Sequence, residues 1–182
     1  SVGTEGGTLE AATGTTFTKT AGTLASENII RFATDSTLTI TGGGNVEIRD
    51  DLGAYGANGF HITKKGPGSL TLSGTNTYTG TTTVSEGSLL VNGKALADAS
   101  SLVVEGGVVI PSGTETVGRL FFGATQQQAG TWGASGSGAQ HIDDTRFSGT
   151  DGVIEVTTGP AGQGFASWAA ANGTTGSIGQ DH

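Results

Sequence analysis

The residues His141-Ile142-Asp143-Asp144 place an imidazole beside two carboxylates, which are side chains that bind divalent metals. A closed metal site needs three or four converging ligands, and adjacent carboxylates on an extended segment point to opposite faces. We therefore predict a polar turn in which Asp side chains accept hydrogen bonds from backbone amides. We expect neither a metal nor another cofactor.

The densest charge cluster consists of Glu47, Arg49, Asp50 and Asp51. Parallel β-helix enzymes that cleave acidic polysaccharides place carboxylates and arginine along one face, and hydrolysis of a glycosidic bond needs two carboxyl groups about 5 to 9.5 Å apart. No accompanying set of Lys or Asp repeats at a regular spacing here. We predict a solvated corner and no catalytic residue, with a polysaccharide-active enzyme that uses Arg49 as the alternative.

Trp132 is the candidate contact for a glycan. A carbohydrate-binding face needs two or three exposed rings in a row, and aromatic residues make up 6% of the chain. An exposed Trp132 would favour a glycan-binding adhesin. The competing interpretation is that Trp132 and Phe147 hold the Gly/Ser-rich loop 133–138 against the body of the protein.

The elements that must position these residues are short strands. The chain has 182 residues, with 34 Gly and no Cys, and it is also rich in Thr, which favours strands, while Gly suits the corners between them. Strand patterns recur about every 7 to 12 residues. They cover 8–11, 15–20, 29–33, 37–41, 46–49, 60–64, 69–73, 81–85, 88–91, 101–105, 108–110, 117–122 and 153–157.

Short strands closed by Gly or Ser indicate a coil rather than a sandwich. In Leu70-Thr71-Leu72 the alternation predicts two inward leucines and an outward threonine. We predict an all-β fold, a right-handed parallel β-solenoid with about 20 to 30 residues per coil, over residues 1–158. Each inward side chain should lie above its counterpart in the next coil. Residues 159–182 should form a linker and tail with a short helix over 165–172.

The charge and hydropathy exclude some partners. A net charge of −8 argues against nucleic acid and anionic membranes. No apolar run approaches the roughly 18 residues of a membrane-spanning helix. We expect partners that are neutral, cationic or further copies of the chain.

Residues 66–93, GPGSLTLSGTNTYTGTTTVSEGSLLVNG, closely resemble the autotransporter-associated β-strand repeat, also called the passenger-associated transport repeat, of very large bacterial surface and secreted proteins. In our interpretation the Gly residues form corners, the aliphatic residues point inward and Tyr78 covers a turn. The structural motif comprises Gly66, Gly68, Leu70, Leu72, Gly74, Tyr78, Gly80, Val84, Gly87, Leu89 and Val91.

A second stretch, residues 129–157, resembles the segment that often closes the last such repeat. The resemblance implies a non-enzymatic structural module like an autotransporter passenger stalk, outside the cell or on its surface. Open coil ends carry unpaired backbone groups, which favours self-association into oligomers or fibres. Glycans or a host surface are further expected partners.

Overall fold

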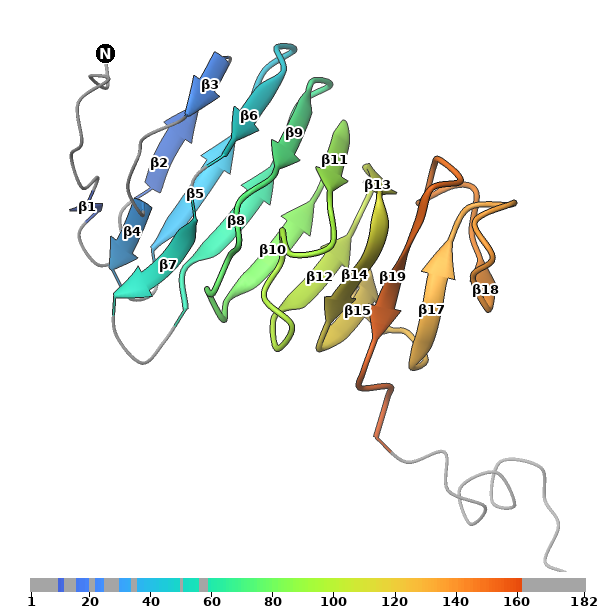
Figure 1. Cartoon of the computed structure of the whole chain (residues 1–182). Helices are drawn as coiled ribbons and strands as arrows, with labels where there is room; N and C mark the ends of the chain where they lie inside the picture. The colour runs from blue at the N-terminus through green and yellow to red at the C-terminus, as the bar shows by residue number, and fades with distance from the viewer. Residues whose placement is uncertain are drawn as a thin grey trace, which may run out of the picture.

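The structure is a computed structural model that describes residues 10–11, 16–19, 22–24, 30–33, 36–49, 51–55 and 59–161. All regular elements in these ranges are strands, and they form a parallel β-solenoid of about four turns (Figure 1). The prediction of an all-β parallel solenoid is therefore confirmed. The helix expected at 165–172 lies outside the described residues.

Two long sheets form two sides of the coil (Figure 1). The first sheet contains, in spatial order, β15 (Arg119–Phe122), β12 (Ser101–Val104), β10 (Thr81–Val84), β8 (His61–Lys64), β5 (Thr37–Ile40) and β2 (Thr16–Lys19), all parallel, with the short antiparallel β16 (Thr125–Gln126) beside β15. The second contains β13 (Val108–Pro111), β11 (Ser88–Val91), β9 (Ser69–Leu72), β6 (Val46–Ile48) and β3 (Gly22–Leu24).

Successive coils stack in register. Thr37 lies beside His61, 24 residues further on, and Ser101 lies beside Arg119, 18 residues further on. These two coils thus have lengths at or just below the predicted range of about 20 to 30 residues. The inward side chains form columns of equivalent positions. One column on the first sheet is Leu38, Ile62, Thr82, Leu102 and Leu120, and one on the second is Val46, Leu70, Leu89 and Val109.

These columns make the core. Apart from Thr82 their members are aliphatic, and all are at most 1% exposed. Burial of each aliphatic side chain therefore stabilises the fold by roughly 1.5 to 3 kcal/mol. Thr71 lies outward between buried Leu70 and Leu72, as predicted. The core is therefore a narrow stack whose stability is distributed along the coil axis.

The third side of the coil changes along its length. It begins as a parallel sheet of β1 (Glu10–Ala11), β4 (Ile30–Ala33) and β7 (Leu52–Tyr55). The next two passes of the chain, 74–80 and 92–99, contain no strand. Strands return with β14 (Gly113–Val117), which pairs with β19 (Gly152–Val156).

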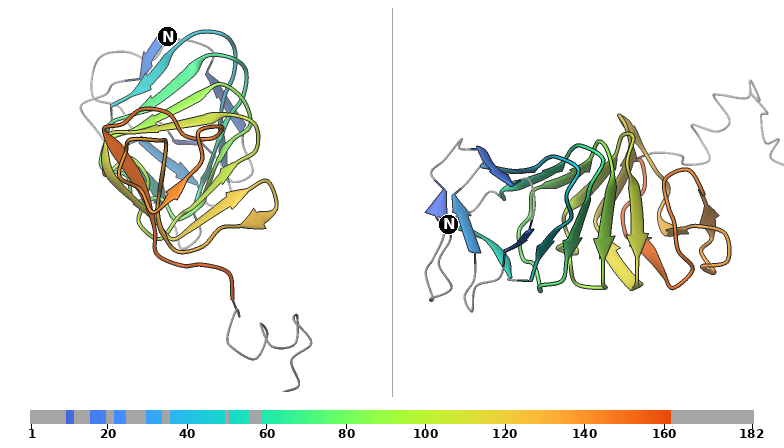
Figure 2. Two further views of the ribbon diagram at one scale, coloured as in Figure 1. Left: turned by 90° about the vertical axis from the view of Figure 1, so that its right-hand side faces the viewer. Right: turned by 90° about the horizontal axis from the view of Figure 1, so that it is seen from above.

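The last described coil is covered by segments that are not part of the parallel stack, two of which, β16 and β17, pair antiparallel with their neighbours. β17 (Gly130–Gly133) is antiparallel to β19 and carries the two-residue β18 (His141–Ile142) on its far edge. The segment Arg146–Ser148 bonds to Val109 and covers the edge of β13. Seen along the coil axis, these C-terminal segments lie across the end of the stack (Figure 2). We call residues 123–158 the C-terminal cap.

Candidate functional site

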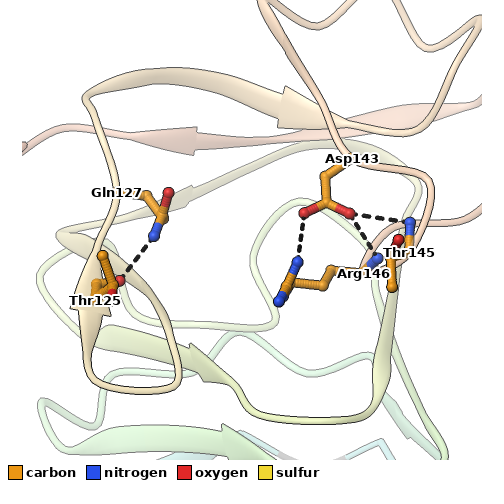
Figure 3. A network of polar contacts seen from close by, with 5 residues as sticks. All are labelled: Thr125, Gln127, Asp143, Thr145 and Arg146. Atoms are coloured by element: carbon orange, nitrogen blue, oxygen red, sulfur yellow. Dashed lines mark hydrogen bonds and ion pairs between the residues drawn. The ribbon is translucent and has the colours of Figure 1, made fainter.

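The predicted polar turn at His141–Asp144 belongs to this cap. The Asp143 carboxylate accepts bonds from the Thr145 and Arg146 amides, at 2.9 and 3.1 Å, and from the Arg146 guanidinium at 2.8 Å (Figure 3). Asp144 accepts bonds from the amide and the hydroxyl of Ser135, which lower the pKa of its carboxyl group. The expected turn chemistry is thus present, and no group of three metal-ligating side chains occurs among the described residues.

The Glu47 cluster forms local bonds. Arg49 donates two hydrogen bonds to the Glu47 carboxylate, at 2.8 and 2.9 Å, and its side chain is 62% exposed. This pairing lowers the pKa of Glu47 and raises the pKa of Arg49. Asp51 accepts a bond from the Thr75 amide of the next coil. Asp50 lies outside the described residues. Within those residues no pair of free carboxyl groups is assembled around Arg49, so the structure adds no support to the enzyme alternative.

Trp132 is 9% exposed and lies inside the cap. Its indole stacks on His141 with ring centroids 4.4 Å apart, and it meets the Phe122 ring edge to face at 5.2 Å. Its Nε1 donates to the Gln128 carbonyl. Phe147 is 1% exposed and also packs against Phe122. These contacts agree with the competing interpretation, in which Trp132 and Phe147 anchor the loop. A glycan contact at Trp132 stays a prediction without support from its burial.

The repeat motif lies where one coil passes into the next. Leu70, Leu72, Val84, Leu89 and Val91 are buried, as predicted. Gly66 and Gly87 have positive φ angles of 75° and 69°, which suits corners. At Gly68, Gly80 and Gly87 an added Cβ would collide with backbone of the neighbouring coil. The glycines therefore serve both the corners and the close stacking of coils, while Gly74 is a buried bend.

The expectation for Tyr78 needs correction. Its side chain is fully buried in the core rather than covering a turn. The ring packs on Phe60 at 4.9 Å, and the hydroxyl shares a 2.6 Å hydrogen bond with Thr82. Burial raises the pKa of Tyr78 far above its ordinary value. Residues 74–80 alternate between buried and exposed positions although no strand forms there, so Tyr78 occupies an inward position of an extended segment.

Asn76 explains why this extended segment can lack strand pairing. Its side chain is 6% exposed, accepts a 2.7 Å bond from the Leu52 amide of one neighbouring coil and donates a short bond to the Ala95 carbonyl of the other. One amide side chain thus satisfies buried backbone groups in two coils, which would otherwise cost about 1 to 3 kcal/mol each.

Glu115, in β14, bonds to buried backbone groups of the preceding pass 92–99, as Asn76 does for its neighbours. The sequence analysis did not identify it. Its carboxylate is buried and accepts bonds from the amides of Gly93, Ala95 and Leu96, at 2.8 to 3.0 Å. Burial raises the pKa of Glu115, the three amide bonds oppose the rise, and the charge of Asp98 adds to it. The Glu115 side chain therefore holds the pass 92–99, which contains no strand, in place through three backbone amides.

Lys64 is a second buried charge that the sequence analysis missed. It occupies the inward column between Ile40 and Val84 and is 1% exposed. Its Nζ donates to the carbonyls of Lys65, Gly66 and Glu86, at 3.0, 2.7 and 3.3 Å. Desolvation lowers the pKa of Lys64, and the Glu86 charge opposes this. The ammonium group joins the corners of two coils.

The third side is hollowed along the passes that contain Asn76 and Thr116. A depression of about 530 Å³ is lined by Thr75, Thr77, Thr79, Lys94, Asp98 and Thr116, among others. A second, of about 420 Å³, is lined by Asp98, Thr116, Arg119, Thr157 and Thr158, among others. The two share Asp98, Ala99 and Thr116 and so form one feature, which we call the third-side trough.

The fold and the buried polar groups together define the class of this protein. Asn76, Lys64 and Glu115 all bond to backbone groups of neighbouring passes, and Tyr78 bonds within the core. These are the contacts of a repeat protein in which each coil is stabilised by its neighbours. Within the described residues, no helix is long and apolar enough to cross a membrane.

Residues 62–91 match the model of the family described as passenger-associated-transport-repeat. The chain therefore contains such a repeat, which spans β8 to β11 and is typical of the passenger domains of autotransporters. This confirms the resemblance noted in the sequence. The association with passenger domains also implies secretion. The chain has no significant match among the curated proteins or among the solved structures.

Proposed function

We propose that this chain is a non-enzymatic structural module of an exported protein, located outside the cell or on its surface. The observation that carries the proposal is the continuous in-register stacking of coils, in which buried polar side chains are engaged in bonds between passes of the chain. Such a stack resists bending and local opening, because every coil is bonded to its neighbours. Its work would be mechanical, as a stiff stalk segment.

Location is tested by treating intact cells of the source bacterium with an external protease and probing with an antibody raised against the folded chain. Loss of the signal, with a cytoplasmic marker retained, supports the proposal. A signal that stays intact until the cells are lysed contradicts surface exposure.

The absence of enzymatic activity is tested separately. We expect no shortening of acidic polysaccharides when the full chain is incubated with them in the presence of calcium. Depolymerisation that is abolished by Arg49→Ala would instead establish the enzyme alternative.

Self-association also belongs to the proposal, with one constraint from the fold. At the C-terminal end of the stack the cap covers the edges of β13 and β15. At the opposite end β1, β2 and β3 are the edge strands of their sheets among the residues that the structure describes. Association by strand pairing would therefore use that end, and sedimentation velocity over a concentration series measures it. A particle that stays monomeric at the highest concentration rules out self-association.

A further inference from the structure

Five of the charged side chains that the structure describes make neither a hydrogen bond nor an ion pair. They are Lys65, Lys94, Asp98, Arg119 and Glu155. Three of the five, Lys94, Asp98 and Arg119, line the third-side trough. The remaining charged side chains that are described bond to backbone, hydroxyl or charged groups, as in Arg49–Glu47 and Arg146–Asp143. Uncommitted charge is therefore concentrated at one place on the described surface.

The trough is also lined by hydroxyl groups. Thr75, Thr77 and Thr79 face outward from one pass of the chain and are exposed. Thr116 and Thr158 line it from later passes. No exposed aromatic or large aliphatic side chain accompanies them in the lining, since Leu96 is 1% exposed. The exposed lining thus offers donors, acceptors and small methyl groups along the coil axis.

The floor of the trough is fixed. Asn76 bonds to Leu52 and Ala95, and the Glu115 carboxylate bonds to the amides of Gly93, Ala95 and Leu96, so both side chains hold the pass 92–99 that lines the larger depression. The pass 92–99 is therefore held without a strand on its outer side. A ligand would therefore meet a preformed hollow. Its volume lies in the range usual for small-molecule sites, about 300 to 1,000 Å³.

We propose that the third-side trough binds a neutral glycan lying along the coil axis. Lys94 and Arg119 can only donate hydrogen bonds, Asp98 as a carboxylate can only accept them, and the Thr hydroxyls do both. Sugar hydroxyl groups also do both, so one ligand satisfies the whole set. This goes beyond the structural role, which requires no ligand.

Other ligand classes fit the trough less well. An acidic polymer would meet the Asp98 carboxylate, which lies in both depressions, on a chain with a net charge of −8. A cationic ligand would meet Lys94 and Arg119. A peptide that binds an extended groove uses pockets for apolar side chains or an open strand edge, and the lining offers neither of these.

The test is affinity electrophoresis of the full chain in native gels that contain one soluble polysaccharide each. The neutral set comprises laminarin, mixed-linkage β-glucan, galactomannan and dextran, and the acidic set comprises pectate and alginate. We expect retardation by at least one neutral polysaccharide. Double substitution Asp98→Ala/Arg119→Ala should weaken that binding at least about tenfold, because each lost bond involves a charged group.

A matched control changes the same charges elsewhere. Lys65→Ala/Glu105→Ala also removes one base and one acid from exposed positions, at corners outside the trough lining. It should bind as the unaltered chain does, and both variants should show unaltered circular dichroism. A further gel contains denatured casein, an unfolded polypeptide, in place of a polysaccharide. The assignment would be overturned by equal loss of binding in both variants, by retardation in the acidic polysaccharides alone or in the casein gel alone, or by no retardation in any gel. None of these outcomes would affect the stalk proposal.

Discussion

Asn76 shows how one side chain can join coils where no regular strand forms. It is the residue that bonds to both neighbouring coils where 74–80 has no strand partner. An alanine there would leave the Leu52 amide and the Ala95 carbonyl buried without a partner. The Asn76 side chain therefore adds two bonds between coils to the backbone bonds that the Asn76 amide makes to Lys94 and the Thr77 amide makes to Leu52.

Asn76→Ala should lower the free energy of unfolding by about 2 to 4 kcal/mol, because each unsatisfied buried group costs about 1 to 3 kcal/mol. Denaturant-induced unfolding followed by circular dichroism measures this. Asn92→Ala, at an exposed asparagine, is the control and should stay within about 0.5 kcal/mol of the unaltered chain. Equal stability of both variants would show that the bridge is dispensable.

Glu115 should make stability depend on pH. Its pKa is raised in the folded state, chiefly by burial, so the folded chain holds this proton more tightly than the unfolded chain does. The resulting stabilisation is fully present below the unfolded pKa of about 4.3 and is lost as the pH rises through the folded pKa.

We therefore expect Glu115→Gln to remove a decline in the free energy of unfolding that the unaltered chain shows as the pH rises above about 4.3. The readout is the slope against pH, not the absolute stability, since glutamine also loses an acceptor for one of the three amides. Glu155→Gln, at an exposed glutamate, should keep the decline. An unchanged slope in Glu115→Gln would contradict the raised pKa.

At the scale of the element, the spacing between coils depends on glycine. Gly80 lies against the Phe60 carbonyl of the preceding coil, and an added Cβ would enter the van der Waals radius of its oxygen and carbon atoms. Phe60 directly precedes β8 and Gly80 directly precedes β10, and these two strands are paired in parallel. The only relief is to move one coil away from the next.

Gly80→Ala should therefore lower the free energy of unfolding by about 2 to 4 kcal/mol, in the upper range for single substitutions. Gly43→Ala is the matched control, because Gly43 is exposed and its added Cβ would lie 3.9 Å from the Pro67 ring. The control should be neutral or slightly stabilising. Thermal unfolding of the two variants side by side decides; a tolerated Gly80→Ala would mean that the coils can separate at this corner without cost.

The strands of the repeat could be predicted from the sequence because an alternating pattern states which face is buried. The same pattern also placed Lys64 and Glu115 inward, since each lies two residues from a buried aliphatic residue, Ile62 or Val117. Their charges hid that signal. What they bond to could not be predicted, because the carbonyls around Lys64 and the amides around Glu115 meet these side chains only once coils of unequal length have stacked.

At the scale of the molecule, the two ends of the stack differ. Towards the N-terminus, the sheets of the described part of the chain end in the edge strands β1, β2 and β3. At the other end β16, β17 and the segment Arg146–Ser148 run over the last coil. Exposed edges template pairing with other chains, and antiparallel or irregular coverage prevents it. In the proposed self-association, the cap would therefore leave strand pairing between copies to the end of the described stack that β1, β2 and β3 form.

The cap is held by Trp132, whose indole contacts Phe122 and His141 and bonds to Gln128. Trp132→Ala should lower the free energy of unfolding by about 3 to 5 kcal/mol. It should also loosen the cap and uncover the edges of β13 and β15. Sedimentation velocity should then show larger species at lower concentration than for the unaltered chain. Ile142→Ser changes a residue of the same cap that is 49% exposed and should leave the distribution unchanged. If Trp132→Ala lost stability without gaining association, the cap would stabilise the last coil but would not be what keeps that end from pairing.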